Sequence, residues 1–161
     1  MKMNPLRLIA LKVRDILGLP SIQQVLPIKI FAGDFGDARN LTALKKFGIK
    51  YVLNIAAEID DPDFTSEGIT QAKYGLVDED DNGNEAKVLC AMACLDRWDR
   101  TRPFLAPILV HCEGGRNRTL YVLARWYGRR MGIDWRDAAL LIQVNRPEME
   151  LHAWMIKQGP K

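Results

Sequence analysis

The fold of this chain is decided by one stretch, His111-Cys112-Glu113-Gly114-Gly115-Arg116-Asn117-Arg118-Thr119. The apolar run Ile108-Leu109-Val110 before it predicts a strand, and the pattern after it predicts a helix. A glycine-containing loop between a strand and a helix turns its backbone N–H groups inward, and with the helix N-terminus it forms a cradle for a phosphate group. The stretch therefore predicts a phosphate-binding loop with Cys112 at its base.

Cys112 is the predicted nucleophile of this loop. A free cysteine is mostly thiol at neutral pH, whereas the thiolate is the reactive form. The helix N-terminus, the loop N–H groups, Arg118 and the Thr119 hydroxyl would all stabilise the thiolate. We assign Thr119 a further role, donating a hydrogen bond to Cys112 while the sulfur acts as leaving group. Arg118 has a planar fork that binds two phosphate oxygens at once, so we expect it to bind substrate and the transferring group.

The remaining residues of the stretch complete the predicted site. Gly114 and Gly115 let the backbone turn and approach phosphate oxygens without a side chain in the way. We expect His111 to order the loop from behind rather than to touch substrate. The predicted phosphate-binding loop consists of Glu113, Gly114, Gly115, Arg116, Asn117 and Arg118.

Attack of a thiolate on a phosphate ester expels an alkoxide or phenoxide, so the reaction needs a proton donor opposite the nucleophile. The acidic loop Asp78-Glu79-Asp80-Asp81 is the evident source. Crowded carboxylates favour the protonated form of one another. The alternative interpretation is that this loop is only a solvated turn.

Composition indicates one globular domain. The chain has 161 residues, 48% of them hydrophobic, which suffices for one core and is too short for two independent domains. The net charge of +3 is too small to indicate nucleic-acid binding. The charge is unevenly distributed, because residues 58–85 hold ten acidic residues and one lysine, whereas residues 97–161 hold twelve basic residues and six acidic ones.

Cysteine usage and the N-terminus indicate a cytoplasmic protein. A thiol enzyme needs a reducing compartment, and the sequence shows neither a signal peptide nor a membrane-spanning run. No His and Cys spacing typical of a metal site is present, so we expect no metal and no other cofactor. Cys90 and Cys94 are interpreted as small buried hydrophobes, with a backup thiol for oxidised Cys112 as the alternative.

Residues 5–17 have apolar side chains on one helical face. Such a helix can lie on an anionic membrane, but a helix packed on the domain is the favoured interpretation.

The rest of the chain alternates short apolar strands with helices. Strands are expected at 28–32, 49–55, 69–77 and 108–110, and helices at 38–47, 85–97, after the loop to about Tyr127, from Asp134 to Arg146, and at 148–157. Residues 33–36 are expected to form a turn. This order predicts an α/β fold with a central, mostly parallel sheet flanked by helices and a helical C-terminal part.

The loop resembles that of the cysteine-dependent dual-specificity phosphatases of the protein tyrosine phosphatase superfamily, HC, five residues, then R followed by S or T. The resemblance covers residues 28–154 and includes IFAGDFGDARNLTALKKFGIKYVLNIAAE and NRPEMELHAWM. It implies the single-domain protein tyrosine phosphatase-like fold. We divide the chain into an N-terminal helical extension, 1–25, and a dual-specificity phosphatase-like catalytic domain, 26–161.

The family resemblance also implies a mechanism. In this family the general acid lies a little over thirty residues before the nucleophile, which places it at Asp81 first, Asp80 second and Asp78 third. The family uses no metal and forms a phosphocysteine that water hydrolyses, with the same aspartate as general base. The chain is thus expected to be a phosphoric monoester hydrolase that dephosphorylates phosphotyrosine and phosphoserine or phosphothreonine.

Substrates other than phosphorylated proteins or peptides are alternatives. Arg116 resembles the basic residue inside the loop of lipid and inositol phosphate phosphatases, and small phosphate or sugar phosphate esters also stay open. The run Asn117-Arg118-Thr119 resembles RNA 5′-triphosphatases, but the acidic segment from Glu58 to Asp81 repels a nucleic acid. Glu113 likewise opposes additional phosphates. A catalytically inactive phosphate-binding module is the non-enzyme alternative.

Overall fold

The computed structural model describes residues 13, 17 and 20–161 of the chain. These residues form an α/β domain around a five-stranded sheet with the strand order β1-β2-β5-β3-β4. The strands are β1 (Gln23–Leu26), β2 (Ile30–Gly33), β3 (Tyr51–Ala56), β4 (Thr70–Leu76) and β5 (Ile108–His111). The helices are α2 (Phe35–Ala38), α3 (Leu41–Lys46), α4 (Asn84–Thr101), α5 (Asn117–Met131), α6 (Trp135–Asn145) and α7 (Ala153–Gln158).

Four strands of the sheet run parallel, and only β1 pairs antiparallel with its neighbour β2. The central strand β5 is flanked by β2 and β3, with His111 opposite both Gly33 and Asn54. The carboxyl ends of these strands therefore meet at one edge of the sheet. Loops that leave this edge lie close together, whatever their separation in the sequence.

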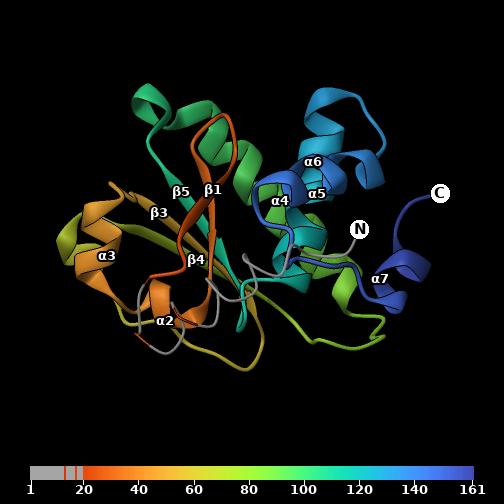
Figure 1. Ribbon diagram of the computed structural model, residues 1–161, viewed down its shortest axis with the longest axis horizontal. Coiled ribbons are helices and arrows are strands. Elements are labelled where there is room, and N and C mark those ends of the chain that lie inside the picture. Colours follow the sequence, from red (N-terminus) through yellow and green to blue (C-terminus); the bar gives the residue numbers. More distant parts are fainter. Residues whose placement is uncertain (1–12, 14–16, 18–19) are drawn as a thin grey trace.

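Both faces of the sheet are covered by helices, with α2 and α3 on one side and α4, α5 and α6 on the other (Figure 1). The alternation of side chains along a strand accounts for the two layers. In β5, Ile108 and Val110 pack in the larger cluster with α4, α5 and α6, whereas Leu109 packs with Leu44 of α3. This two-sided burial explains why β5 is apolar throughout.

The predicted fold class, with its mostly parallel sheet and helical C-terminal part, is confirmed. Several boundaries differ. The helix expected over 38–47 is shortened to α3, and a separate short helix, α2, precedes it where a turn was expected. Asp34 caps α2 and Asn40 caps α3 through hydrogen bonds from backbone N–H groups. Asp34 thus begins a helix instead of lying within a turn. The last helix, expected from residue 148, begins only at Ala153, and α4 extends beyond its predicted end to Thr101.

Strand β1 was not predicted, since four residues at the edge of a sheet leave little periodic signal. The predicted helix over 5–17 lies outside the described residues. Among the residues that the structure does describe, no helix has the length and hydropathy needed to cross a bilayer.

Helices α5 and α6 pack closely because Gly128 has no side chain. A Cβ atom at this position would lie 2.9 Å from Trp135 Cα and 3.1 Å from the Ile133 carbonyl oxygen. Both neighbours are backbone atoms, which cannot move without shifting the turn between the helices.

We therefore expect Gly128→Ala to destabilise the domain, although the same change in an exposed helix stabilises it by about 1 kcal/mol. Overpacking of this kind costs about 1–3 kcal/mol. Urea denaturation followed by circular dichroism measures the difference. A variant more stable than the wild type would contradict the close packing of α5 on α6.

Candidate active site

The candidate site lies where parallel strands end. Asp34 follows β2, Glu58 lies two residues after β3, Asp78 lies two residues after β4, and Cys112 follows β5 directly. The loops after parallel strands are the usual location of ligand sites in α/β proteins. The sheet thus brings one thiol and several carboxylates to the same edge.

Cys112 lies at the base of the loop between β5 and α5 and is 3% exposed. The Thr119 hydroxyl Oγ1 donates a hydrogen bond to Cys112 Sγ over 3.2 Å. Thr119 is itself fully buried in the first turn of α5, so this hydroxyl is held in place. The contact is the one expected from the sequence, and a donor in this position favours the charged sulfur.

The loop rests directly on the backbone of β2 through Gly115. Gly115 has a φ of +61°, and a Cβ atom there would lie 2.1 Å from the Gly33 carbonyl oxygen and 3.0 Å from Arg146 Nη2. Gly114, by contrast, would bring a Cβ within 4 Å of no described atom. Only Gly115 is thus required by packing and conformation together.

Arg118 is 2% exposed and points toward the loop after β3. Its two terminal nitrogens donate to both carboxylate oxygens of Glu58, Nη1 over 2.7 Å and Nη2 over 2.5 Å, and Nη1 also donates to the Leu76 carbonyl over 2.9 Å. The hydrogen bonds from Arg118 lower the pKa of Glu58. The bidentate pair therefore neutralises and orients the guanidinium.

His111 lies fully buried behind the loop. Its Nδ1 is 3.2 Å from the Cys112 carbonyl oxygen, and its Nε2 is 2.8 Å from Asp61 Oδ2. Both ring nitrogens face oxygen acceptors, so the ring is held between the Cys112 backbone and the Asp61 carboxylate. This arrangement supports the prediction that His111 orders the loop.

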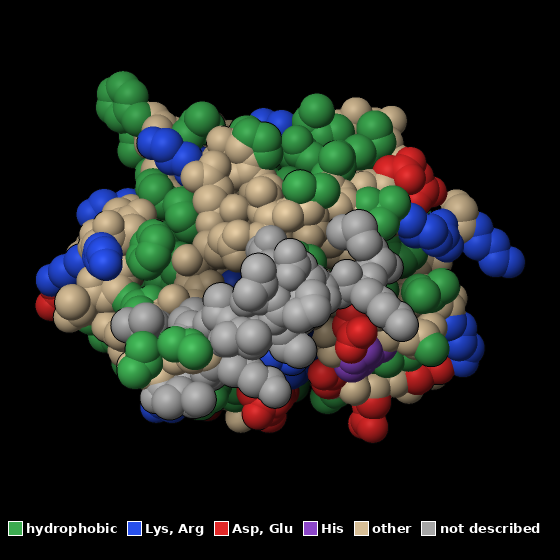
Figure 2. All heavy atoms as spheres, in the orientation of Figure 1, with side chains coloured by type: hydrophobic (Ala, Val, Ile, Leu, Met, Phe, Trp, Pro, Cys, Tyr) green, Lys and Arg blue, Asp and Glu red, His purple; other side chains and the backbone are tan. Residues whose placement is uncertain are grey.

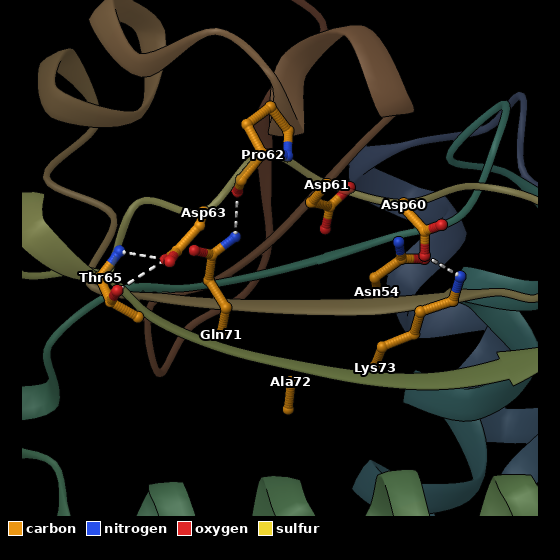
Figure 3. A pocket seen from close by; sticks show the side chains of 9 residues that line it. All are labelled: Asn54, Asp60, Asp61, Pro62, Asp63, Thr65, Gln71, Ala72 and Lys73. Atoms are coloured by element: carbon orange, nitrogen blue, oxygen red, sulfur yellow. Dashed lines mark hydrogen bonds and ion pairs between the residues drawn. The ribbon is translucent and has the colours of Figure 1, made fainter.

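Asp61 also lines a hollow of about 300 Å³ beside β3 and β4 (Figure 3). The loop that holds Asp61 crosses above the two strands, and Lys73 of β4 reaches Asp60 over 2.7 Å. The hollow contains none of the residues of the phosphate-binding loop. It lies behind the site, and His111 separates it from the nucleophile.

The acidic loop after β4 approaches the phosphate-binding loop at Asp78. Asp78 Oδ2 lies 3.9 Å from Arg118 Nε. A cavity of about 420 Å³ is lined by both residues together with Ala57, Glu58, Val77, Glu79 and Glu113. Of the three aspartates considered as general acid, Asp78 is the one that lines this cavity.

Asp80 and Asp81 are held in other contacts. Lys157 Nζ donates a hydrogen bond to Asp80 Oδ2 over 2.6 Å, and the Gln158 side-chain amide donates another to Asp80 Oδ1. The two hydrogen bonds lower the pKa of Asp80. Asp81 Oδ1 accepts a hydrogen bond from the Gly83 N–H over 2.7 Å, which closes the turn before α4. A carboxyl with a lowered pKa, such as Asp80, carries its proton less often near neutral pH and is therefore less available as a general acid.

The remaining loop residues face two sides of the site. Glu113, Gly114 and Arg116 are exposed, while Asn117 is partly buried at the start of α5. A second cavity, of about 490 Å³, lies on the far side of Glu113 and is lined by Gly114, Arg116, Phe35 and other residues. Glu113 lines both cavities and thus separates them.

Three contact residues were missed in the sequence: Glu58, Asp61 and His152. Glu58 and Asp61 follow a strongly apolar strand, and in a parallel sheet such residues lie near the end of the neighbouring strand. The apolar strand expected at 49–55 could therefore have indicated that Glu58 and Asp61 lie near the loop. His152 comes from the C-terminal part of the chain, where no strand position indicates proximity to the loop.

The two other cysteines differ in environment. Cys94 is buried, and burial raises the pKa of its thiol, as expected for a small hydrophobe. Cys90 is exposed, so the prediction of burial is wrong for that residue. It lies on the outer side of the amphipathic helix α4.

The family model for the dual specificity phosphatase catalytic domain matches residues 30–158. This chain belongs to the dual specificity phosphatase family. The resemblance inferred from the loop is confirmed, and the match extends from β2 to the end of α7. The loop between β5 and α5 lies within the matched residues.

Curated relatives agree with this assignment. The domain is 23% identical over 135 residues to dual specificity protein phosphatase Mpk3 of Drosophila melanogaster, covering 84% of this chain and 32% of that protein. It is 24% identical over 123 residues to human dual specificity protein phosphatase 6, covering 76% of this chain and 31% of that protein. The chain thus spans about a third of the length of these two relatives.

Solved structures show the same fold. Human DUSP28 superimposes with a TM-score of 0.72 at 20% identity, covering 86% of this chain and 90% of that one. A mouse putative dual specificity phosphatase complexed with zinc tungstate gives a TM-score of 0.74 at 21% identity, covering 86% and 84% of the two chains.

The contrast between the two loop glycines gives a paired test. Gly115→Ala should lower the thermal midpoint by several degrees, because the new methyl group meets a backbone carbonyl and the residue keeps a positive φ. Gly114→Ala, which meets no described atom, should shift the midpoint much less. Differential scanning calorimetry measures both. Equal shifts would show that the loop does not depend on its contact with Gly33.

Proposed function

We propose that this dual specificity phosphatase domain hydrolyses phosphate monoesters of phosphorylated proteins through a phosphocysteine intermediate. The observation that carries the proposal is the hydrogen bond of 3.2 Å from Thr119 Oγ1 to Cys112 Sγ at the base of the loop. A buried sulfur with a fixed hydroxyl donor is arranged for use as a nucleophile and as a leaving group. The curated relatives named above are protein phosphatases.

In the first step, the Cys112 thiolate forms a bond to phosphorus while the bond to the ester oxygen breaks. The leaving oxygen takes a proton from a carboxylic acid, and we assign this role to Asp78. In the second step, water attacks the phosphocysteine, the Asp78 carboxylate accepts the proton of this water, and the sulfur leaves as thiolate, stabilised by Thr119. Inorganic phosphate is the product.

Arg118 supplies the charge that the transferring group needs. Its Nη atoms are bound by Glu58 and Leu76, whereas its Nε is buried and has no hydrogen-bond partner among the described residues. This Nε points to the side of Asp78, at 3.9 Å. A phosphate in the cavity can accept from it, together with the backbone N–H groups of the loop.

The charges around the cavity support a substrate with one phosphate group. Its lining includes one guanidinium and four carboxylates, namely Glu58, Asp78, Glu79 and Glu113. Additional phosphates, as in an inositol polyphosphate or an RNA 5′-triphosphate, would approach these carboxylates and be repelled. A phosphotyrosine, phosphoserine or phosphothreonine carries a single phosphate and avoids this repulsion.

Cys112→Ser should reduce hydrolysis of an aryl phosphate by on the order of 10³-fold or more, because the nucleophile is lost. The assay is run in EDTA with phosphotyrosine peptide, phosphothreonine peptide, inositol phosphates and 5′-triphosphate RNA in parallel. The peptides should be hydrolysed fastest. Wild-type protein that binds these compounds without turnover would instead be a phosphate-binding module.

The assignment of the proton donor rests on the position of Asp78 beside Arg118. Asp78→Asn should lower kcat by about 10²-fold for phenyl phosphate, whose leaving group is poor, and much less for p-nitrophenyl phosphate. Asp81→Asn and Asp80→Asn are matched controls on the same loop. If Asp81→Asn alone caused a large loss of kcat that depended on the leaving group, the general acid would be Asp81, the residue that the family spacing favours.

A further inference from the structure

His152 connects the acidic loop with the phosphate-binding loop. Its ring Nδ1 lies 3.3 Å from Asp78 Oδ1, and its Nε2 contacts the side-chain Nδ2 of Asn117. Asn117 is the first residue of α5, and His152 precedes α7, where its carbonyl accepts the Met155 N–H over 3.0 Å. One side chain therefore bridges three segments that are distant in the sequence.

The ring of His152 lies between an amide and a carboxylate. The Asn117 amide nitrogen faces Nε2, and the Asp78 carboxylate lies 3.3 Å from Nδ1, within ion-pair distance. Asn117 Oδ1 is buried and has no hydrogen-bond partner among the described residues. Half a turn of the amide would present this oxygen to the ring instead. Asn117 can thus hold the ring of His152 through either end of its amide.

Helix α7 fixes the acidic loop at a second point as well. Lys157 Nζ lies 2.6 Å from Asp80 Oδ2, and Gln158 donates to Asp80 Oδ1 over 2.5 Å. Figure 1 shows the chain after β4 passing next to α7, and Figure 2 shows acidic side chains gathered around a histidine on one face of the protein. The start of α7 thus holds Asp78 at the site, and its end holds Asp80 in a separate contact.

We propose that His152 is a positioning residue that holds Asp78 beside the phosphate-binding loop, an inference that rests on the proposed role of Asp78 as proton donor. Neither spacing nor the strand order brings this histidine to the site. It acts through Asp78 and not on the phosphate, because its ring contacts the carboxylate and Asn117.

Asp78 is surrounded by other charged groups. Arg118 also faces Asp78, with Glu58 bound to Arg118, while Glu79 and Glu113 line the same cavity and Lys157 is paired with Asp80. Of these groups, Arg118 lies on the side of the phosphate-binding loop, so loss of the imidazole should leave Asp78 held from that side only.

Two substitutions separate the contacts of the ring. In His152→Asn the side-chain amide lies near the position of Nδ1 and can still donate to Asp78. In His152→Gln it lies near the position of Nε2 and reaches Asn117 instead. The variants are compared by kcat for phenyl phosphate and p-nitrophenyl phosphate from about pH 5 to about pH 8.

For phenyl phosphate, His152→Gln should lower kcat about tenfold, which is part of the rate acceleration of about 10²- to 10⁴-fold that a general acid contributes. Hydrolysis of p-nitrophenyl phosphate should stay within about twofold. His152→Asn should retain most of the wild-type rate. Lys157→Ala, a control on the same helix, should leave the leaving-group dependence unchanged.

The Asp78→Asn background shows whether His152 acts through Asp78. There, His152→Gln should cause no further loss. An equal loss for both substrates, or a further loss in that background, would overturn the proposal while leaving the phosphatase activity intact. If the wild-type protein showed no turnover, and its rate equalled that of Cys112→Ser, the proposed function would be overturned instead.

A second measurement does not depend on turnover. The ring ¹⁵N resonances of His152 should change on Asp78→Asn and stay unchanged on Asp81→Asn, because the Asp78 carboxylate lies against the ring whereas the Asp81 carboxylate is bound to the Gly83 N–H. Resonances that do not respond to Asp78→Asn would overturn the proposal, whatever the kinetics show.

Discussion

The contact between the backbones of Gly115 and Gly33 is the constraint on which the site depends. It seats the phosphate-binding loop on the end of β2, at a distance that admits no Cβ atom. Arg146 stabilises the same place from below, donating over 2.7 Å to the Ser21 carbonyl and over 3.2 Å to the Ala32 carbonyl. The position of Cys112 is therefore set by backbone packing at the centre of the sheet.

The charges of the site are arranged around this fixed loop. Arg118 is buried and bound in a bidentate pair by Glu58, and His111 is bound by Asp61. Arg118 and His111 thus each have a carboxylate partner from the segment after β3. The loop after β4 adds Asp78 from another side, and the start of α7 adds His152. Contributions from four segments converge because the strands that precede three of them are parallel neighbours.

Much of this could be predicted from the sequence. The spacing of Cys112, Arg118 and Thr119 between a strand and a helix is sufficient for the loop, and the order of elements is sufficient for the fold class. The choice among the aspartates could not be made in this way. Spacing favours Asp81, but the side chain of Asp81 closes its own turn and Asp80 is held by α7, whereas Asp78 faces Arg118. Such differences depend on tertiary contacts, which spacing does not encode.

The same limit applies to the short elements. The helix expected over 38–47 is shortened to α3, which begins only after Asn40 because the side chain of Asn40 caps it. The segment 148–152 continues the turn that follows α6 and has no regular structure, so α7 begins only at Ala153. The local pattern of apolar residues does not show these boundaries.

The pairing of Arg118 with Glu58 has a consequence for the way in which the loop can hold an anion. The guanidinium already has an anionic partner within the protein, so an incoming anion adds to an existing pair and meets a partly compensated charge. Such an arginine binds a free dianion less tightly than an unpaired one would.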